Sequence, residues 1–344
     1  MVATASHRRI DAELERRRTA ARASLEERRA HAFGLCPALE ELDRGMAHAG
    51  LEASRKLVAG EMAPDDARAA LESEASSFVG RRSKLLEQAG LPPGYLDLAP
   101  SCALCGDTGL VRGDGPASGQ VACPCVRRML ADELYEISNL RAAGPAGFDL
   151  FDGGLYSGEP DAAKYGYAES PKDNILDIFG SAQRYVQSLL GGEGEDLYFF
   201  GRPGTGKTFM AAAIAREAVR GGVAALYQTA PSLFGAITEH RMRQYRDEQY
   251  SDERYQRIFR ANLLVIDDLG TESMTDARYA EFITLLNSRL ASSAPRLSTI
   301  IVTNMDLHAL RDAYDERITS RIMGSFRIVP FFGDDIRLAK NERG

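Results

Sequence analysis

Short apolar runs alternate with longer amphipathic segments in the second half of the chain. The apolar runs are residues 196–200, 223–229, 263–269 and 298–304, and their length and flanking polar residues predict buried strands. Residues 208–219 and 276–290 have apolar positions at helical spacing. Strands that alternate with helices indicate a parallel sheet with helices on both faces, so an α/β domain is expected.

The first quarter of the chain has a helical pattern instead. Residues 6–32 are rich in Arg, Glu and Ala and have only sparse apolar positions. They predict a solvated helix, which serves either as a charged spacer or as a partner-binding helix. Further helices are predicted at 37–58 and 65–90. A Pro- and Gly-containing cluster at 91–94 then ends the helical pattern, so a mainly helical N-terminal region is expected.

These changes of pattern divide the chain into four segments. Residues 1–95 form the helical region, and residues 96–135 form a small cysteine-containing module that ends in a further helix-like run. Residues 136–171 are rich in Gly and Pro and are interpreted as an ordered linker. Residues 172–344 form the α/β domain.

Composition and charge narrow the class of protein. Hydrophobic residues make up 44% and charged residues 26% of the 344 residues, which is typical of a soluble globular protein. No apolar run approaches the length of a bilayer span and no signal-peptide pattern begins the chain, so we expect a cytoplasmic protein without membrane contact. The net charge of −7 means that any contact with nucleic acid must come from a local patch.

A phosphate-binding motif follows the first predicted strand of the α/β domain. The pattern G-x-x-x-x-G-K-[ST] is matched by Gly201, Arg202, Pro203, Gly204, Thr205, Gly206, Lys207 and Thr208. The glycines let backbone N–H groups surround phosphates, and the following helix adds its positive N-terminal end. Lys207 is expected to reach the β- and γ-phosphates, and Thr208 to ligate Mg²⁺. The motif therefore predicts a nucleotide-binding site.

Two adjacent carboxylates end the strand at 263–269. In a Walker B arrangement, Asp267 would hold Mg²⁺ through water and Asp268 would orient and deprotonate the attacking water. The alternative is a turn followed by a helix cap. Many Walker B motifs have Glu at the second position. Because Asp268 is shorter, its assignment as the catalytic base stays open. Asn304 ends the next predicted strand, where it either senses the γ-phosphate or is a turn residue.

Four of the five cysteines lie within residues 101–125. Cys102, Cys105, Cys123 and Cys125 form two closely spaced pairs, and four thiolates in such pairs favour tetrahedral zinc over disulfides in a cytosolic protein. An iron–sulfur cluster is the alternative. Cys36 is isolated and is interpreted as a core residue.

With these motifs in place, the segment from about Phe148 onward resembles the AAA+ ATPases of the bacterial replicative helicase loader family, the DnaC/DnaI type, and the related IstB transposition helpers. The resemblance is carried by GRPGTGKT, YQTAPSLFGAITEHR, LLVIDDLGTE, STIIVTN, ERITSRIMGSF and FFGDDIRLAKN. It implies a P-loop AAA+ fold, self-association through that domain, and ATP hydrolysis stimulated by assembly and DNA.

The resemblance also implies roles for individual residues. Asn304 corresponds to the sensor 1 residue, Arg321 to an arginine finger that acts on the neighbouring subunit, and Arg337 to the sensor 2 arginine. Arg317, one helical turn before Arg321, is the reserve finger candidate. The plainer interpretation of these arginines is that they are solvated or paired with neighbouring acids.

A helix between the second strand and Walker B is implied to face single-stranded DNA. The residues expected to contact DNA are Arg241, Arg243, Tyr245 and Arg246, because arginine can follow phosphates and tyrosine can stack on a base. Residues 239–260 contain six arginines and five acidic residues, so a salt-bridged helix face is the competing interpretation.

The cysteine module separates the functional hypotheses. C-x-x-C-x-D-T-G resembles the zinc module of DnaI-type loaders, which implies that residues 1–135 dock on the hexameric replicative helicase. The leading hypothesis is an ATP-dependent loader that delivers this helicase onto single-stranded DNA during replication initiation or restart. The alternatives are an IstB-like transposition helper and a nucleotide-dependent adaptor with little hydrolysis.

Overall fold

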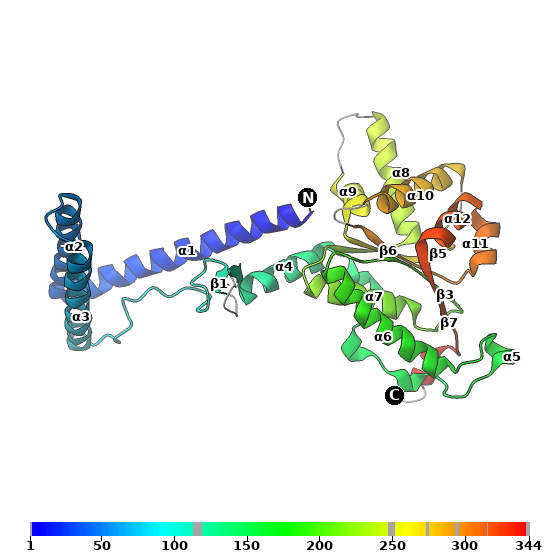
Figure 1. The fold of residues 1–344 in the computed structure, drawn as a ribbon, viewed down its shortest axis with the longest axis horizontal. Helices are drawn as coiled ribbons and strands as arrows, with labels where there is room; N and C mark the ends of the chain where they lie inside the picture. The colour runs from blue at the N-terminus through cyan, green and yellow to red at the C-terminus, as the bar shows by residue number, and fades with distance from the viewer. Residues whose placement is uncertain are drawn as a thin grey trace. The chain divides into compact units, whose positions relative to one another are not determined.

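The chain divides into two compact units. A computed structural model describes residues 2–112, 119–246, 252–272, 275–292, 296–314 and 316–341. One unit contains residues 11–123, and the other contains residues 1–10 together with 124–344. Helix α1 (Val2–Leu35) provides residues to both, and Figure 1 shows the order of the elements along the chain.

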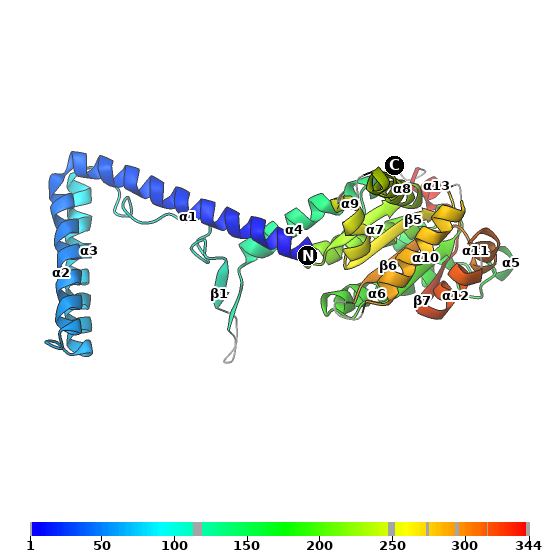
Figure 2. The same ribbon diagram turned by 90° about the horizontal axis from the view of Figure 1, so that it is seen from above.

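Helices dominate the unit of residues 11–123. Its other helices are α2 (Pro37–Val58) and α3 (Pro64–Gln88), and β1 (Leu110–Arg112) pairs antiparallel with β2 (Gln120–Ala122). Both helices begin at a proline, which suits the first helical turn because it lacks the N–H that would have no partner there. The helices lie side by side in Figures 1 and 2. A small core that includes Leu39, Leu86 and Leu96 stabilises this unit.

The other unit is built on a five-stranded parallel sheet. Its strands are β3 (Asp196–Gly201), β4 (Ala225–Thr229), β5 (Leu263–Leu269), β6 (Ser298–Thr303) and β7 (Phe326–Phe331). The order across the sheet is β4-β5-β6-β3-β7, and every neighbouring pair is parallel. The carboxyl ends of the strands therefore meet at one edge, where ligands bind in open α/β sheets.

Helices cover both faces of this sheet, as Figure 1 shows. The α-helices are α4 (Pro124–Ile137), α5 (Ala162–Tyr165), α6 (Pro171–Leu190), α7 (Lys207–Arg220), α8 (Ala230–Arg246), α9 (Glu253–Arg260), α10 (Asp276–Leu290), α11 (Leu307–Tyr314), α12 (Glu316–Ser325) and α13 (Ile336–Asn341). Short 3-10 helices are η1 (Leu140–Ala143), η2 (Phe148–Leu150) and η3 (Gly153–Leu155). Leu197 and Phe199 pack with α6 and α7, whereas Tyr198 packs with α8 and α10, because successive strand residues point to opposite faces. The predicted fold, a parallel sheet flanked by helices after a mainly helical N-terminal region, is confirmed.

Two features differ from the sequence interpretation. The unit that contains the sheet includes residues 124–344 as well as residues 1–10, so the expected linker of residues 136–171 belongs to it. The reason is aromatic packing, since Phe151 stacks on Phe179 of α6 at a centroid distance of 4.2 Å. Strand β7 has no counterpart among the predicted strands because Pro330 interrupts its pattern. Proline is tolerated there because β7 is an edge strand.

Among the described residues, no helix combines the length and the apolar character needed to cross a membrane.

Candidate functional site

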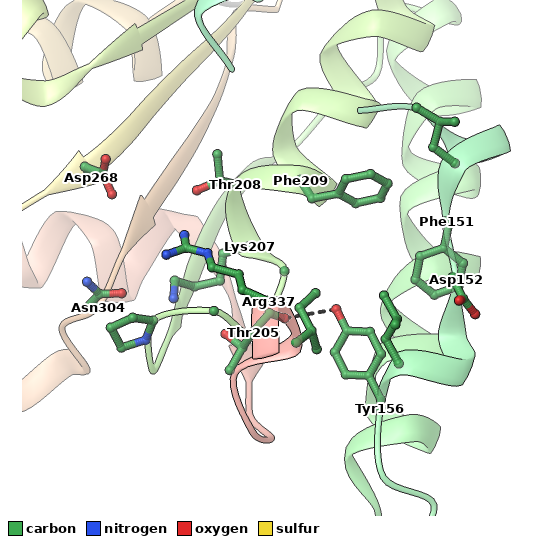
Figure 3. A pocket seen from close by; sticks show the side chains of 16 residues that line it. Phe151, Asp152, Tyr156, Thr205, Lys207, Thr208, Phe209, Asp268, Asn304 and Arg337 are labelled. Atoms are coloured by element: carbon green, nitrogen blue, oxygen red, sulfur yellow. Dashed lines mark hydrogen bonds between the residues drawn. The ribbon is translucent and has the colours of Figure 1, made fainter. Parts of the chain in front are cut away.

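A pocket of about 530 Å³ opens beside the loop between β3 and α7. Its lining residues are Leu150, Phe151, Asp152, Leu155, Tyr156, Pro203, Gly204, Thr205, Gly206, Lys207, Thr208, Phe209, Asp268, Asn304, Ile336 and Arg337. Figure 3 shows that the polar side chains of Lys207, Asp268, Asn304 and Arg337 lie on one side of this space, and the aromatic rings of Phe151 and Tyr156 on the other. The pocket thus has a polar end, whose residues could bind phosphates, and an apolar end.

The loop between β3 and α7 requires glycine at two positions. Gly204 and Gly206 have φ values of +75° and +92°, which residues other than glycine adopt only with strain. A Cβ atom at Gly204 would lie 2.1 Å from the Asp335 carboxylate, and one at Gly206 would lie 2.3 Å from the Tyr156 hydroxyl. The loop therefore packs too tightly for side chains at these positions, and glycine backbone lets an anion approach the N–H groups of such a loop closely.

Lys207 is held against the loop that it follows. Its ammonium donates to the carbonyl oxygens of Gly201 and Arg202 at 2.8 and 2.7 Å, and the residue is 6% exposed. Burial lowers the Lys207 pKa to about 8, although the negative charges of Asp267 and Asp268 oppose this shift. A bound polyphosphate would supply the strong anionic partner that this buried cation needs.

Asp267 and Thr208 fit a magnesium ion. The Thr208 hydroxyl donates to Asp267 Oδ1 at 3.2 Å, which brings the start of α7 to the end of β5. A hydroxyl and a carboxylate are the oxygen ligands that Mg²⁺ prefers beside nucleotide phosphates. Burial raises the Asp267 pKa, and a hydrogen bond from the Tyr227 hydroxyl opposes this shift. The structure thus brings these two predicted ligands together.

Three further predicted residues converge on the same space. Asp268, Asn304 and Arg337 all line the pocket, and their side chains are exposed. Asp268 has φ +55°, an uncommon backbone conformation for a residue other than glycine. Asp268 lies at an irregularity in the β5–β6 pairing and is exposed, whereas Asp267 is buried, so the two adjacent acids occupy different environments.

The segment at 148–156 contributes to the pocket, which sequence reasoning missed. Tyr156 donates from its hydroxyl to the Thr205 carbonyl at 3.2 Å. Leu150, Phe151 and Leu155 line the apolar end together with Ile336. The only local signal was a cluster of aromatic residues within a Gly-rich passage, which is not specific for a ligand site.

Comparison with known proteins shows which family the α/β domain resembles. The model of the IstB-like ATP binding protein family matches residues 180–343, which include the loop at 201–208 and Asp267. Residues 180–343 form an IstB-like ATP-binding domain.

Curated relatives match the same half of the chain. The replicative helicase loader DnaC of Escherichia coli (strain K12) is 28% identical over 165 residues, which is 47% of this chain and 64% of DnaC. The putative insertion sequence ATP-binding protein y4pL of Sinorhizobium fredii is 27% identical over 177 residues, 48% of this chain and 66% of that protein. The matches thus span about three fifths of the curated relatives' length. A crystal structure of DnaI matches with a TM-score of 0.43 at 24% identity, covering 56% of this chain and 94% of that chain.

Two predicted arginines of the IstB-like domain lie elsewhere on its surface. Arg317 and Arg321 are exposed on α12, and neither is among the described residues that line the pocket. A role in the pocket of the same chain is therefore not favoured. This placement leaves the predicted action on a neighbouring subunit as a proposal.

The predicted DNA-contacting residues of the IstB-like domain lie near the end of α8. Arg241 pairs with the buried Glu281 at 3.3 Å, and Arg243 pairs with Glu239 at 2.5 Å. Tyr245 is 94% exposed, and Arg246 is exposed as well. The intervening part of the predicted segment, residues 247–251, lies outside the described residues. Two of the four candidates are thus in ion pairs, as the salt-bridge interpretation predicts.

The four clustered cysteines have the arrangement of a metal site. Their Sγ atoms, from Cys102, Cys105, Cys123 and Cys125, all lie within 4.8 Å of one another. The Cys102 and Cys123 sulfurs are 3.8 Å apart, which is about the separation that tetrahedral zinc with 2.3 Å bonds requires. The donor set therefore fits zinc. Cys36 is partly buried against the core of residues 11–123.

Asp107 orders the loop that presents the first pair of these cysteines. Its buried carboxylate accepts from the backbone N–H groups of Ser101 and Cys102 at 2.7 and 2.9 Å. The Thr108 hydroxyl donates to the Cys105 carbonyl at 2.6 Å. The sequence C-x-x-C-x-D-T thus gives a tight turn in which both thiols face one point.

Proposed function

We propose that this chain is an ATPase that binds Mg²⁺–ATP in the pocket of its IstB-like domain. The observation that carries the proposal is the convergence of Lys207, Asp268, Asn304 and Arg337 on one pocket beside the Thr208–Asp267 pair. When bound, Mg²⁺ supplies charge neutralisation between the β- and γ-phosphates. Asp268 orients and deprotonates water, Lys207 binds the β- and γ-phosphates, and Asn304 and Arg337 read the γ-phosphate.

The reaction serves to deliver the hexameric replicative helicase onto single-stranded DNA. The match to a replicative helicase loader supports this role. The zinc-type cysteine cluster upstream of the ATP-binding domain favours the loader, because its sequence resembles the zinc module of DnaI-type loaders. The helical N-terminal region with this module docks on the helicase, and the ATP-binding domain self-associates.

A loading assay tests this role with the full chain. Hexameric helicase from the source organism is mixed with closed circular single-stranded DNA, and the helicase retained on DNA is measured with and without this protein and ATP. We expect retention to require both. Equal retention without the protein, or with the Lys207→Ala variant, would reject the loader function.

A transposition helper is the second candidate. It is favoured by the match to an insertion sequence ATP-binding protein at nearly the same identity and coverage. The two candidates differ in their partner protein, so affinity purification of the full chain from its source organism, with and without ATP, separates them. Recovery of a transposase rather than the replicative helicase would support this candidate.

DNA contact is assigned to the end of α8. Tyr245 is the residue best exposed for stacking on a base, with Arg246 beside it for phosphate contact. Arg241 and Arg243 lie in the preceding turns, where they would have to exchange their pairing with Glu281 and Glu239 for phosphate contact. We expect Tyr245→Ala to weaken binding of single-stranded oligonucleotide by about tenfold, since stacking is worth about 1–3 kcal/mol per base. Arg220→Ala, an exposed arginine of α7, is the control.

A further inference from the structure

The Asp267 carboxylate is surrounded by three hydrogen-bond donors. Its Oδ1 accepts from the Thr208 hydroxyl at 3.2 Å and from the Asp268 backbone N–H at 2.9 Å. Its Oδ2 accepts from the Tyr227 hydroxyl. Asp267 is 1% exposed, so protein groups rather than bulk water set the direction in which this carboxylate points.

Tyr227 reaches Asp267 from the neighbouring strand. In the β4–β5 register, Tyr227 lies opposite Val265 and Thr229 lies opposite Asp267. Because side chains two residues apart in a strand share a face, Tyr227 and Asp267 both project toward α7, which carries Thr208. The tyrosine ring is 3% exposed and packs in the core on this face. Its hydroxyl is therefore directed at the carboxylate by packing as well as by the hydrogen bond.

The backbone of Tyr227 is fixed as well. Strand β4 is at the edge of the sheet, and the outer side of Tyr227 pairs with the turn after α4. Its N–H donates to the Ser138 carbonyl at 2.8 Å, and the Asn139 side-chain amide donates to the Tyr227 carbonyl at 3.1 Å. Asn139 has φ +59°, a conformation that asparagine adopts more readily than most residues.

We propose that Tyr227 is the positioning residue for the magnesium-binding carboxylate, and that Asn139 holds this tyrosine in place from the edge of the sheet. The proposal rests on the proposed Mg²⁺–ATP function. With Oδ2 engaged by Tyr227, Oδ1 stays beside Thr208, where the metal is expected. Partners that orient a metal ligand in this way commonly govern metal affinity about 10- to 100-fold.

The decisive experiment measures Mg²⁺ dependence without measuring hydrolysis. A fluorescent ATP analogue is titrated against the full chain at a series of Mg²⁺ concentrations and in EDTA. For Tyr227→Phe, we expect about tenfold more Mg²⁺ to be needed for the same affinity, with the affinity in EDTA unchanged. Asn139→Gly keeps the positive φ but removes the amide donor, and we expect a shift in the same direction that is smaller.

Tyr185→Phe is the matched control. Its hydroxyl is also removed from a buried tyrosine, but it donates to the Glu195 carbonyl at 2.8 Å and is not among the described residues that line the pocket. We expect it to behave as wild type. An unchanged Mg²⁺ requirement in Tyr227→Phe, or an equal shift in Tyr185→Phe, would overturn the positioning role of Tyr227 but not the proposed function. Wild-type protein that binds the nucleotide without any Mg²⁺ dependence would overturn the proposed function together with it.

Discussion

The Thr208 hydroxyl donates to Asp267 Oδ1 at 3.2 Å, although 59 residues separate the two along the chain. The pair joins the first turn of α7 to the end of β5 and places two candidate oxygen ligands for Mg²⁺ beside the loop at 201–208. The next residue, Asp268, lies at an irregularity in the β5–β6 pairing, has φ +55° and lines the pocket. The proposed function therefore gives the neighbouring carboxylates different roles, Asp267 at the metal and Asp268 at the reacting water.

Replacing Asp268 should therefore separate ATP binding from hydrolysis. We expect Asp268→Asn to lower kcat by about 10²–10⁴-fold, because it removes the general base. Nucleotide affinity should stay close to wild type, since asparagine also tolerates a positive φ. Steady-state hydrolysis and equilibrium nucleotide binding provide the two readouts.

Asp306→Asn is the control for this variant. Its carboxylate accepts from the Ala309 N–H at 2.8 Å and is not among the described residues that line the pocket. Its kcat should match wild type. Wild-type protein that binds ATP but hydrolyses it no faster than Asp268→Asn would instead fit the nucleotide-dependent adaptor.

The sequence was sufficient for four of the five strands of the sheet and for the polar end of the pocket, because these depend on local patterns. The run LLVIDDL became β5 at the predicted residues, and the loop at 201–208 follows β3. The apolar end was not predictable in the same way. Tyr156 contacts Thr205 across 49 residues and Tyr227 contacts Asp267 across 40. Such pairs follow from how helices and strands pack, which no short motif encodes.

Gly206→Ala should impair both stability and nucleotide binding. The alanine would have to adopt φ +92° and place its Cβ 2.3 Å from the Tyr156 hydroxyl. We expect a loss of about 1–3 kcal/mol in the free energy of unfolding, as for other strained backbone positions. ATP binding should be lost because the loop must shift. Thermal denaturation and nucleotide titration measure the two effects.

Gly235→Ala in α8 tests whether the effect is specific to the loop. A Cβ there meets no atom within 4 Å, and alanine is favoured over glycine in a helix. We expect about 0.5–1 kcal/mol of added stability and unchanged nucleotide binding. Similar losses in both variants would contradict the tight-packing account of the loop.

Nucleotide binding should take up protons near pH 8. Burial lowers the Lys207 pKa to about 8 in the protein without ligand, and bound phosphates favour the charged form and raise it. The bound state then holds more protons, so affinity should fall as the pH rises through 8 toward the bound-state pKa. Calorimetric titrations at pH 8 in two buffers of different ionisation enthalpy should reveal an uptake of about half a proton per site.

Lys207→Arg is the matched control because its guanidinium stays charged throughout this pH range. We expect weaker binding with no buffer-dependent heat from this position. The same proton uptake in both proteins would assign the effect to another group.

The cysteine cluster should hold one zinc ion per chain. We expect Cys102→Ser combined with Cys105→Ser to abolish zinc binding and to make residues 101–125 susceptible to protease, because structural zinc contributes directly to folding. ATP binding should be unchanged. Elemental analysis and limited proteolysis check these outcomes.

Cys36→Ser should keep its zinc, because Cys36 is not one of the four clustered thiols. Iron and visible absorbance in the wild-type protein would show that the four thiols hold an iron–sulfur cluster instead. Zinc retained in the double variant would reject this ligand set.

Arg321 should act on the ATP site of a neighbouring subunit. It is exposed on α12 and is not among the described residues that line the pocket of its own chain. We expect Arg321→Ala to lower kcat by about 10³-fold or more, as for other arginine fingers, without weakening ATP binding. Arg317→Ala, one helical turn earlier, is the matched control, and a larger loss there would transfer the role to Arg317.

Mixing variants tests whether the arginine acts between subunits. Arg321→Ala has an intact pocket but lacks the arginine, and Lys207→Ala has the arginine but lacks an intact pocket. Each variant alone should therefore be nearly inactive. In a random equimolar mixture, about one quarter of the interfaces pair an intact pocket with an intact arginine. We therefore expect the mixture to regain about a quarter of the wild-type rate, with a rate per subunit that rises with protein concentration. A mixture as inactive as its components would place the effect of Arg321 within its own chain.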